Sequence, residues 1–514
     1  MAKISRYHHI KKVEEFRYFY ISPKINYYPM FLMPGKKIFV FILLFSLCIS
    51  QLPAQTYQPT WESVDKRSVP SWFTDAKFGI FIHWGVYSVP AYRPVSKKMY
   101  ETYAEWYEPD VYANAALRKS FHNKHYGEDF KYRDFAPMFK AELFDPEYWA
   151  NLFVRSGAKY VVLTSKHHDG FCMWPTKVPS KKNWNSMDTG PKRDLLGDLS
   201  KAVRAKGLKM GLYFSLMEWE STSTNGRHNG QYLMKEEIDK YKIPEDKYVD
   251  ENMMPQLKEL VTNYQPSIIF SDGEWDKPAA YWKSAEFLSW LYNNAPNKQE
   301  VVVNDRWGIG TRGVNGGYHT SEYSSEADKV STAHPWEESR GMGQSYGFNR
   351  AENIDDYNTS EQLVHELVSI VSRGGNLLLN IGPDGDGTIP VIMQQRLADI
   401  GDWLQINGEA IYGTSPWLTE KPGAVKTAAN PQLYYTAKNK TVYVISPKWP
   451  EKNILVAGAK GTPGTRVTML GVDGAVKFTN TKTGVLITVP AVSPAKVKGK
   501  YAYVFKVENV TKAL

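Results

Sequence analysis

The segment 145–170, "DPEYWANLFVRSGAKYVVLTSKHHDG", contains the two sequence patterns, helical and strand-like, that decide the fold. In its first half, Trp149 and Phe153 recur at helical spacing, and Gly157 is typical of a helix end. The second half contains "AKYVVLTSK", a run of β-branched and aromatic residues that predicts a buried strand. A helix that leads directly into a strand is the repeating unit of a layered α/β fold.

The same alternation extends in both directions, from about residue 57 to residue 413. Helical patterns precede apolar runs at 208–216, 267–272 and 376–384, with short joints between them. This pattern predicts a mainly parallel sheet, and we expect residues 56–413 to form a (β/α)8-like TIM barrel. After residue 413, short strands alternate with turn sequences such as "VDG", which predicts a C-terminal antiparallel β-sandwich over 414–514.

The first 55 residues have the composition of an N-terminal extension followed by a secretory signal peptide. Lys36 and Lys37 precede the apolar run "IFVFILLFSLCIS" and the small-residue zone "QLPAQ". The run is short for a membrane-spanning helix, so we expect no stable membrane insertion after cleavage. We expect translation to start at Met30 or Met33, and the mature protein to be periplasmic or secreted. Cys172 would then be its only cysteine, which leaves no disulfide and no Cys-based metal site.

The charge gives little support to a nucleic-acid partner. The chain of 514 residues carries a net charge of +9, but residues 1–37 contain eight Lys and Arg against two Glu, so the remainder carries only +3. That remainder has no long basic run, and we predict no nucleic-acid binding. Aromatic residues make up 14% of the chain, which suits both sugar stacking and an ordinary core.

Polar groups stand at the ends of five apolar runs in the first domain. The C-terminal ends of parallel barrel strands converge on one face, where barrel active sites lie, so we expect these groups to share a site. They are His83, His167 with His168, Tyr213, Asp272, and Arg306.

Side chains of these types serve several kinds of enzyme chemistry. A metal-dependent hydrolase that uses His83, His167 and His168 is one alternative, but adjacent residues on a strand point to opposite faces. The sequence offers no HxH pair, so no metal site is predicted. It also shows no phosphate-binding loop and no nucleophile elbow.

A pair of carboxylates fits better. A retaining glycosidase needs one ionised acid and one protonated acid, and Asp272 with Arg306 nearby suits the ionised one. Glu274 shares a turn with Asp272, so it is poorly placed to reach the opposite side of a substrate. Glu322 and Glu326 lie on what we expect to be a loop, which could fold over the mouth of the barrel.

Six blocks of the sequence resemble glycoside hydrolase family 29, the retaining α-L-fucosidases. They are "WFTDAKFGIFIHWGVYSVPAY", "YAEWY", "AKYVVLTSKHHDGFCMWPTK", "GLKMGLYFSLMEW", "NDRWG" and "SRGGNLLLNIGPDGDG". The resemblance runs in order from about residue 57 to residue 413, and the C-terminal β-sandwich resembles the second domain of that family.

The resemblance implies an exo-acting enzyme that releases α-L-fucose from fucosylated glycans by double displacement, without a cofactor. It implies that Asp272 is the nucleophile and Glu322 the acid/base. The implied substrate-binding residues are His83, Glu105, Trp106, His167, His168, Tyr213, Phe270, Arg306 and Tyr346. A non-catalytic fucose-binding protein on the same scaffold is a further alternative, and the presence of both acids argues against it.

The sequence departs from the family pattern at Phe270, where many members carry Trp, so an indole N–H donor is absent. The stretch "WEESRGMGQSYGFN" resembles the branch of the family with relaxed aglycone choice, and Tyr346 within it is expected to line the pocket for the C5 methyl group. Asp169 is expected to orient a neighbouring loop, and Asp384 and Asp386 to be turn residues.

Overall fold

The structure is a computed structural model that describes residues 56–96, 98, 101–219, 243–323, 334–417 and 433–512. The predicted extension and signal peptide lie outside the described residues. Residues 56–514 form one compact unit. Helix α14 (Ser360–Ser372) and strand β10 (Tyr434–Lys438) lie on either side of the domain boundary expected after residue 413, and they pack against each other. The boundary therefore stays a prediction.

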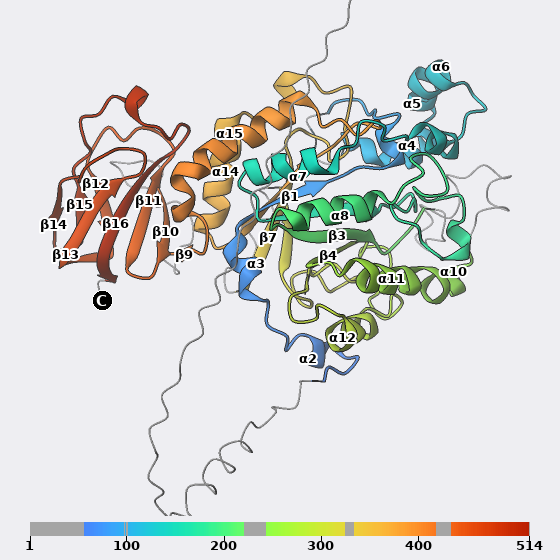
Figure 1. Ribbon diagram of the computed structural model, residues 1–514, viewed down its shortest axis with the longest axis horizontal. Coiled ribbons are helices and arrows are strands. Elements are labelled where there is room, and N and C mark those ends of the chain that lie inside the picture. Colours follow the sequence, from blue (N-terminus) through green and yellow to red (C-terminus); the bar gives the residue numbers. More distant parts are fainter. Residues whose placement is uncertain are drawn as a thin grey trace, which may run out of the picture. The chain divides into compact units, whose positions relative to one another are not determined.

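Residues 56–413, the part expected to be catalytic, are built on one curled sheet of eight parallel strands (Figure 1). The prediction of a (β/α)8-like barrel is confirmed. The order of the strands is β5-β4-β3-β2-β1-β8-β7-β6, so neighbours in sequence are neighbours in space. Their bounds are β1 Phe78–Ile82, β2 Tyr160–Lys166, β3 Lys209–Ser215, β4 Ile268–Asp272, β5 Val302–Val303, β6 His319–Glu322, β7 Trp336–Gly341 and β8 Asn376–Ile381.

Helices follow most of these strands and cover the outside of the sheet. The longer ones are α7 Pro146–Arg155, α8 Leu195–Ala205, α11 Met254–Tyr264, α12 Ser284–Asn294, α14 Ser360–Ser372 and α15 Val391–Asn407. Shorter ones are α2 Trp61–Val64, α3 Ser71–Ala76, α4 Tyr107–Ala113, α5 Ala115–Leu117, α6 Asn123–Tyr126 and α10 Glu245–Lys247. Side-chain caps explain where three of them begin: Asp145 accepts from the Tyr148 amide, Asp194 from that of Gly197, and Thr359 from that of Gln362.

Strands β6 and β7 are made largely of polar residues, which is why the apolar pattern did not predict them. In β7, Glu337, Glu338 and Ser339 are all buried. Their polar atoms find partners inside the barrel wall: Tyr160 donates to Glu337, and Arg340 Nε donates to Glu338 at 2.9 Å. Burial raises the pKa of Glu337 to about 8, so this carboxyl is largely neutral at pH 7.

The barrel has a seam between β5 and β6, which are not paired as a ladder. Among the described residues, two backbone bonds cross it, from Tyr318 N–H to Val303 O at 3.0 Å and from Gly317 N–H to Asn304 O at 3.4 Å. The buried Asp305 side chain adds three more bonds. Its Oδ1 accepts from the Thr320 amide at 3.1 Å and from the Thr320 hydroxyl at 2.6 Å, and its Oδ2 accepts from the Gly313 amide at 2.8 Å. A side chain therefore replaces ladder bonds at the seam.

The C-terminal part consists of two antiparallel sheets, as predicted. One has the order β13-β16-β11-β10-β9 and the other β12-β15-β14. The bounds are β9 Ser415–Pro416, β10 Tyr434–Lys438, β11 Thr441–Ser446, β12 Ile454–Ala457, β13 Ala459–Met469, β14 Phe478–Asn480, β15 Gly484–Ile487 and β16 Tyr503–Lys512.

Residues of the larger sheet alternate between two cores. Tyr443 and Ile445 belong to the core of the catalytic part, whereas Val442 and Val444 pack within the two C-terminal sheets. This is the period of two expected when both faces of a strand are covered. The indole of Trp403 in α15 also donates to the carbonyl of residue 502 at 3.0 Å, so the larger sheet lies directly against the helical layer.

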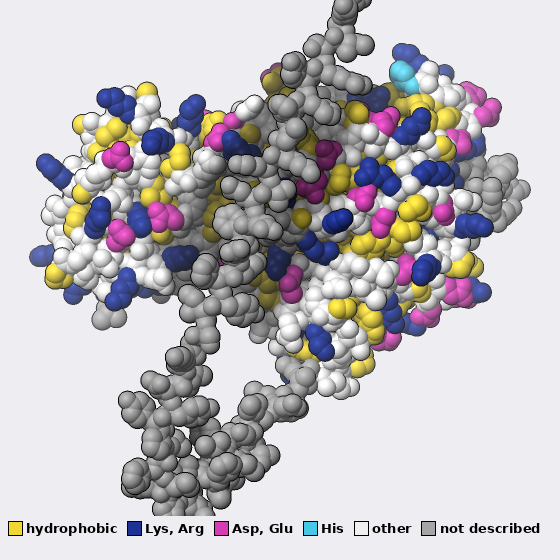
Figure 2. Space-filling model, viewed as in Figure 1, with side chains coloured by type: hydrophobic (Ala, Val, Ile, Leu, Met, Phe, Trp, Pro, Cys, Tyr) yellow, Lys and Arg dark blue, Asp and Glu magenta, His cyan; other side chains and the backbone are white. Residues whose placement is uncertain are grey.

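The surface carries mixed charge. On the face shown in Figure 2, Lys and Arg side chains are interspersed with Asp and Glu over both the catalytic and the C-terminal part. Within the described ranges, no helix combines the length and the apolar character needed to cross a membrane.

We predict that Asp305→Ala lowers the free energy of unfolding by about 2–4 kcal/mol, because two buried donors of Thr320 and the amide of Gly313 lose their acceptor. Chemical denaturation monitored by tryptophan fluorescence measures this change. Asp65→Ala is the matched control, since the exposed Asp65 also accepts two bonds, from Asn315 and Gly316, and water can replace it. Equal losses in the two variants would contradict the proposed role of Asp305 at the seam.

Candidate active site

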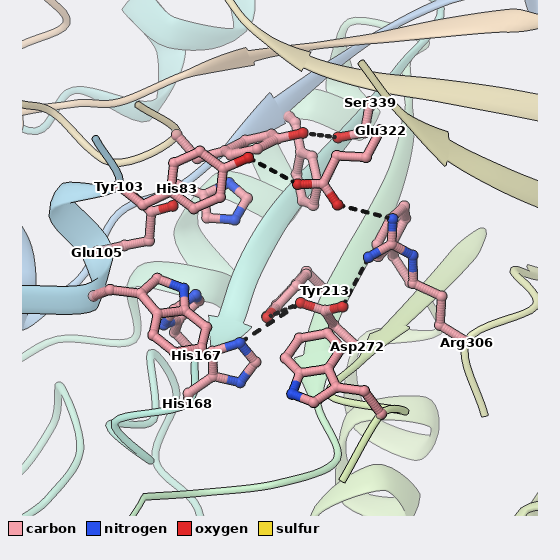
Figure 3. A pocket seen from close by; sticks show the side chains of 15 residues that line it. His83, Tyr103, Glu105, His167, His168, Tyr213, Asp272, Arg306, Glu322 and Ser339 are labelled. Atoms are coloured by element: carbon pink, nitrogen blue, oxygen red, sulfur yellow. Dashed lines mark hydrogen bonds and ion pairs between the residues drawn. The ribbon is translucent and has the colours of Figure 1, made fainter. Parts of the chain in front are cut away.

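A cavity of about 250 Å³ opens at the C-terminal ends of the barrel strands (Figure 3). All eleven side chains predicted for the site line it: His83, Glu105, Trp106, His167, His168, Tyr213, Phe270, Asp272, Arg306, Glu322 and Tyr346. They come from six strand ends and from two connecting segments, so the fold brings together residues up to 263 positions apart in the chain. The cavity is smaller than the range of about 300–1,000 Å³ that is usual for drug-sized ligands, and it suits a single sugar ring.

Asp272 is the last residue of β4 and is held by two hydrogen-bond donors, with a histidine nearby. Arg306 Nη1 donates to its Oδ1 at 3.0 Å, the Tyr213 hydroxyl donates to its Oδ2 at 2.8 Å, and His168 Nε2 lies 3.7 Å from Oδ2. Burial alone would raise the pKa of Asp272, but the Arg306 charge, with His168 and Tyr213, outweighs it and leaves that pKa below its ordinary value. The carboxylate is therefore ionised at neutral pH, as a nucleophile must be.

Glu322 faces Asp272 across Arg306. Arg306 Nη2 donates to Glu322 Oε2 at 3.2 Å, and the Tyr103 hydroxyl donates to Oε1 at 3.0 Å. Figure 3 shows the guanidinium between the two carboxylates, with one nitrogen directed at each. The third nitrogen, Nε, donates to the Thr320 hydroxyl at 3.0 Å, which is also bound to Asp305 at the seam. Glu322 ends strand β6, so the prediction that it lies on a loop is wrong.

Glu274 is separated from the cavity. It does not line it, although its side chain is buried and its Oε2 has no partner among the described residues. Burial raises the pKa of Glu274 to about 7, and Arg312 lies 4.0 Å from its Oε1. Glu326 falls outside the described residues. Of the three acids considered beside Asp272, Glu322 is therefore the one that the described structure places in the cavity.

His83 follows β1 and is set up as a neutral acceptor. Burial lowers its pKa to about 4, even though a bond to Asn380 opposes this shift. The side-chain amide of Asn380 donates to the Tyr346 carbonyl at 2.6 Å, so the Asn380 oxygen accepts from His83 Nδ1 at 2.7 Å. His83 Nε2 then carries no proton and can accept a hydrogen bond from a ligand hydroxyl.

His167 and His168 both line the cavity, so the expectation that they face opposite sides is wrong. Strand β2 ends at Lys166, and the two histidines lie in the turn that follows, where the alternation of a strand no longer applies. His168 Nδ1 bonds the Ser215 hydroxyl at 2.6 Å. His167 Nδ1 is buried without a partner in the described structure, and burial keeps its pKa well below the ordinary value. A ligand hydroxyl would satisfy it.

The donor set does not suit a metal ion. Among the described residues, no group of three or more His, Cys, Asp and Glu is arranged to hold one. The Nδ1 atoms of His83 and His168 are engaged with an amide and a hydroxyl, and Asp272 is engaged with Arg306. The geometry therefore favours carboxylate chemistry over the metal-dependent alternative.

Aromatic rings and one buried acid complete the cavity. Phe270 lies 5.1 Å from Phe81 between ring centroids, and Tyr346 lies 4.8 Å from His83. Glu105 accepts from the Gly347 amide at 2.8 Å, and burial raises its pKa to about 7. Trp106 stands edge-on to His168, with centroids 5.5 Å apart. The site thus combines apolar walls with a few polar groups, as sugar pockets do.

Four lining residues were not predicted: Phe81, Tyr103, Trp275 and Ser339. Phe81 lies two positions before His83 on the same strand face, a signal that the period of a strand supplies. Tyr103 and Trp275 each lie within three positions of a predicted site residue, Glu105 and Asp272. Ser339 lies on the polar strand β7, which no pattern in the sequence revealed.

Three acids expected to be bystanders lie outside the cavity. The Asp169 carboxylate accepts from the Tyr132 hydroxyl at 2.8 Å and from the Phe171 amide at 3.1 Å, so it orders the turn after β2. Asp384 and Asp386 bond the amides of Gly385 and Thr388 within their own turn.

The structure is a parallel barrel in which two carboxylates face each other across a pocket lined by aromatic rings. This combination defines a glycoside hydrolase. The comparisons then specify the class. A family model described as alpha-L-fucosidase matches residues 44–409, and one described as the alpha-L-fucosidase C-terminal domain matches residues 426–508. The chain belongs to the alpha-L-fucosidase family.

Individual relatives agree. The chain is 40% identical over 489 residues to an alpha-L-fucosidase of Dictyostelium discoideum, covering 92% of this chain and 100% of that one. It is 41% identical over 462 residues to the tissue alpha-L-fucosidase of Homo sapiens, covering 89% and 93%. Its structure resembles that of the Thermotoga maritima alpha-fucosidase in complex with fucose, with a TM-score of 0.73 at 37% identity, over 88% and 100%. The protein is thus a glycoside hydrolase that releases fucose.

We predict that Arg306→Lys raises the pKa of Asp272, because an ammonium is a point charge and cannot bond both carboxylates as the guanidinium does. The acidic limb of kcat/KM reports the ionisation of the free enzyme, so it should move to higher pH by about one unit. The measurement is a pH profile on an aryl α-L-fucoside. Arg312→Lys, a similar change outside the cavity, should leave the limb in place. An unshifted limb in Arg306→Lys would contradict this account.

Proposed function

We propose that Asp272 is the nucleophile and Glu322 the acid/base of a retaining double displacement at a terminal α-L-fucose. The observation that carries the proposal is the single guanidinium of Arg306 that joins the two acids at the mouth of a closed pocket. One of these acids has a lowered pKa, as the nucleophile requires.

In the first step, a carboxylate oxygen of Asp272 attacks the anomeric carbon while protonated Glu322 gives its proton to the glycosidic oxygen. The bond to the aglycone breaks, and the aglycone leaves as an alcohol. In the second step, ionised Glu322 takes a proton from water as the water oxygen attacks the same carbon. The ester bond to Asp272 breaks, and fucose leaves with its α configuration retained.

Arg306 suits both steps. Before the first step the negative charge lies on Asp272. In the covalent intermediate Asp272 is a neutral ester, and the charge lies on Glu322. Because the guanidinium donates to both carboxylates from a fixed position, it stays paired with whichever acid is ionised. No side chain has to move to follow the charge, which keeps the cost of reorganisation low.

Several of the other lining residues would bind the sugar. Neutral His83 and His167 offer ring nitrogens to the sugar hydroxyls, and Glu105 offers carboxyl oxygens. The rings of Phe270 and Tyr346 would enclose the C5 methyl group. Since these residues are buried at one end of the pocket, only a terminal sugar could enter, which supports exo action.

We include a relaxed choice of aglycone in the proposal. It rests on the resemblance of the stretch 336–349 to the branch of the family with that property. Within it, Tyr346 belongs to the pocket, and its hydroxyl bonds Ser339 at 3.0 Å.

The acid/base assignment has a direct test. Asp272→Ala should lower kcat/KM on an aryl α-L-fucoside by about four orders of magnitude or more. Glu322→Ala should lower it by about 10²–10⁴-fold, least for good leaving groups, and azide should restore turnover with α-L-fucosyl azide as the product. The anomeric configuration of the azide is read by NMR.

Glu274→Ala is the control, and azide should not rescue any loss that it shows. Rescue of Glu274→Ala instead of Glu322→Ala would move the acid/base to Glu274. An active Asp272→Ala variant would overturn the mechanism. Loss of wild-type turnover after exhaustive chelation would favour the metal-dependent alternative.

Export is also part of the proposal and rests on the composition of residues 36–55. Expression of the full chain in a bacterial host should give mature protein outside the cytoplasm. Its N-terminus, read by sequencing, should lie close to residue 55. Protein that stays in the cytoplasm with its N-terminus intact would contradict export.

A further inference from the structure

The exposure of the lining residues shows which way a bound sugar faces. Of the fifteen described side chains that line the cavity, eleven are buried. The side chains of Asp272 and Glu322 are 13% and 15% exposed. Trp275 is 42% exposed, which is the largest value in the lining. Apart from Trp106, which is half-buried, the order from the floor to solvent is therefore sugar-binding residues, then the two carboxylates, then Trp275.

Trp275 is held at the mouth by the turn that carries Asp272. Gly273 has φ of 82°, and a Cβ there would lie 2.6 Å from Met217 Cγ, so both its conformation and its packing require glycine. The indole stands edge-on to His168, with ring centroids 5.6 Å apart at 74°. A ring in this position stays available to a ligand while its edge is anchored.

The chemistry of the site determines what reaches that ring. The bond that breaks lies between the two carboxylates, with the fucose on the buried side. The leaving group must therefore extend from the carboxylates toward solvent, past the side chain at the mouth. An indole has a large apolar face and one polar N–H, which suits a ligand that is apolar on one face and wet on the other.

We propose that Trp275 is the platform of an aglycone subsite and stacks on the apolar face of a pyranose leaving group. This inference rests on the proposed function, because it uses the two carboxylates to locate the bond that breaks. A flat contact of this kind binds a ring without selecting which hydroxyl carries the fucose. It is thus compatible with a relaxed choice of aglycone.

The test compares two substrates that share the fucose and differ beyond it. α-L-Fucosyl fluoride has no ring to stack, whereas an α-L-fucosyl-galactose disaccharide has a pyranose aglycone. Trp275→Ala should lower kcat/KM for the disaccharide by about tenfold and leave that for the fluoride within about twofold. Trp275→Phe, which keeps an aromatic face, should recover most of the loss.

Two further measurements complete the test. Inhibition by L-fucose, which occupies only the buried part of the pocket, should be unchanged in Trp275→Ala. Tyr148→Ala is the matched control, since it removes a ring that is 48% exposed on α7 and should affect neither substrate.

The possible outcomes separate the two claims. A wild-type protein that cleaves neither substrate would overturn the proposed function itself. If wild type is active, an equal loss on both substrates in Trp275→Ala would mean that the change disturbs Asp272, and it would overturn the subsite. No loss on the disaccharide in Trp275→Ala would also overturn it.

Discussion

The interaction on which the site depends is the contact of one buried guanidinium with two carboxylates. Burial would lower the pKa of Arg306, but the carboxylates of Glu274, Asp272 and Glu322 raise it well above its ordinary value. A buried charge without a partner is costly, and two buried acids side by side repel each other. Arg306 reduces both costs, so Asp272 and Glu322 can stand close together in a pocket with little water. This allows the two acids, which we propose to be the nucleophile and the acid/base, to share one small space.

The same arginine connects the chemistry to the architecture. The two carboxylates that Arg306 joins come from opposite sides of the barrel seam, Asp272 from β4 and Glu322 from β6. The ladder is absent there, and bonds of Asp305 and Thr320 take its place. The Thr320 hydroxyl also accepts from Arg306 Nε. Thr320, which helps to close the seam, therefore sets the position of the guanidinium that holds both acids. The stability of the barrel and the geometry of the acids are therefore coupled.

Burial explains the state of the other polar groups. The low pKa of His83 keeps it neutral, and the bond to Asn380 sets its tautomer, so this residue offers hydrogen bonds without adding positive charge. An acceptor nitrogen and a half-protonated Glu105 suit hydroxyl groups, which both donate and accept. The aromatic rings between them supply apolar area. The high aromatic content of the chain therefore serves both a core and a pocket. Many of the aromatic residues form the core, and a smaller group lines the pocket.

The sequence by itself determined the repeating helix and strand units, the antiparallel C-terminal part, and the residues at the strand ends. These features follow from local patterns, since the spacing of apolar residues distinguishes strands from helices and polar groups mark where apolar strands stop. It did not reveal β6 and β7, because their polar side chains are stabilised by distant partners such as Tyr160. The prediction that His167 and His168 point to opposite faces was wrong for a related reason, since the point at which a strand ends depends on its neighbours in the sheet. Only the tertiary structure placed Glu322, and not Glu274, opposite Asp272, because distance along the chain says little about distance across a barrel. The stretch "SDGEW" carries one acid inside the pocket, one buried acid outside it and the exposed ring of Trp275, and Gly273, with φ of 82°, lets the chain turn between them.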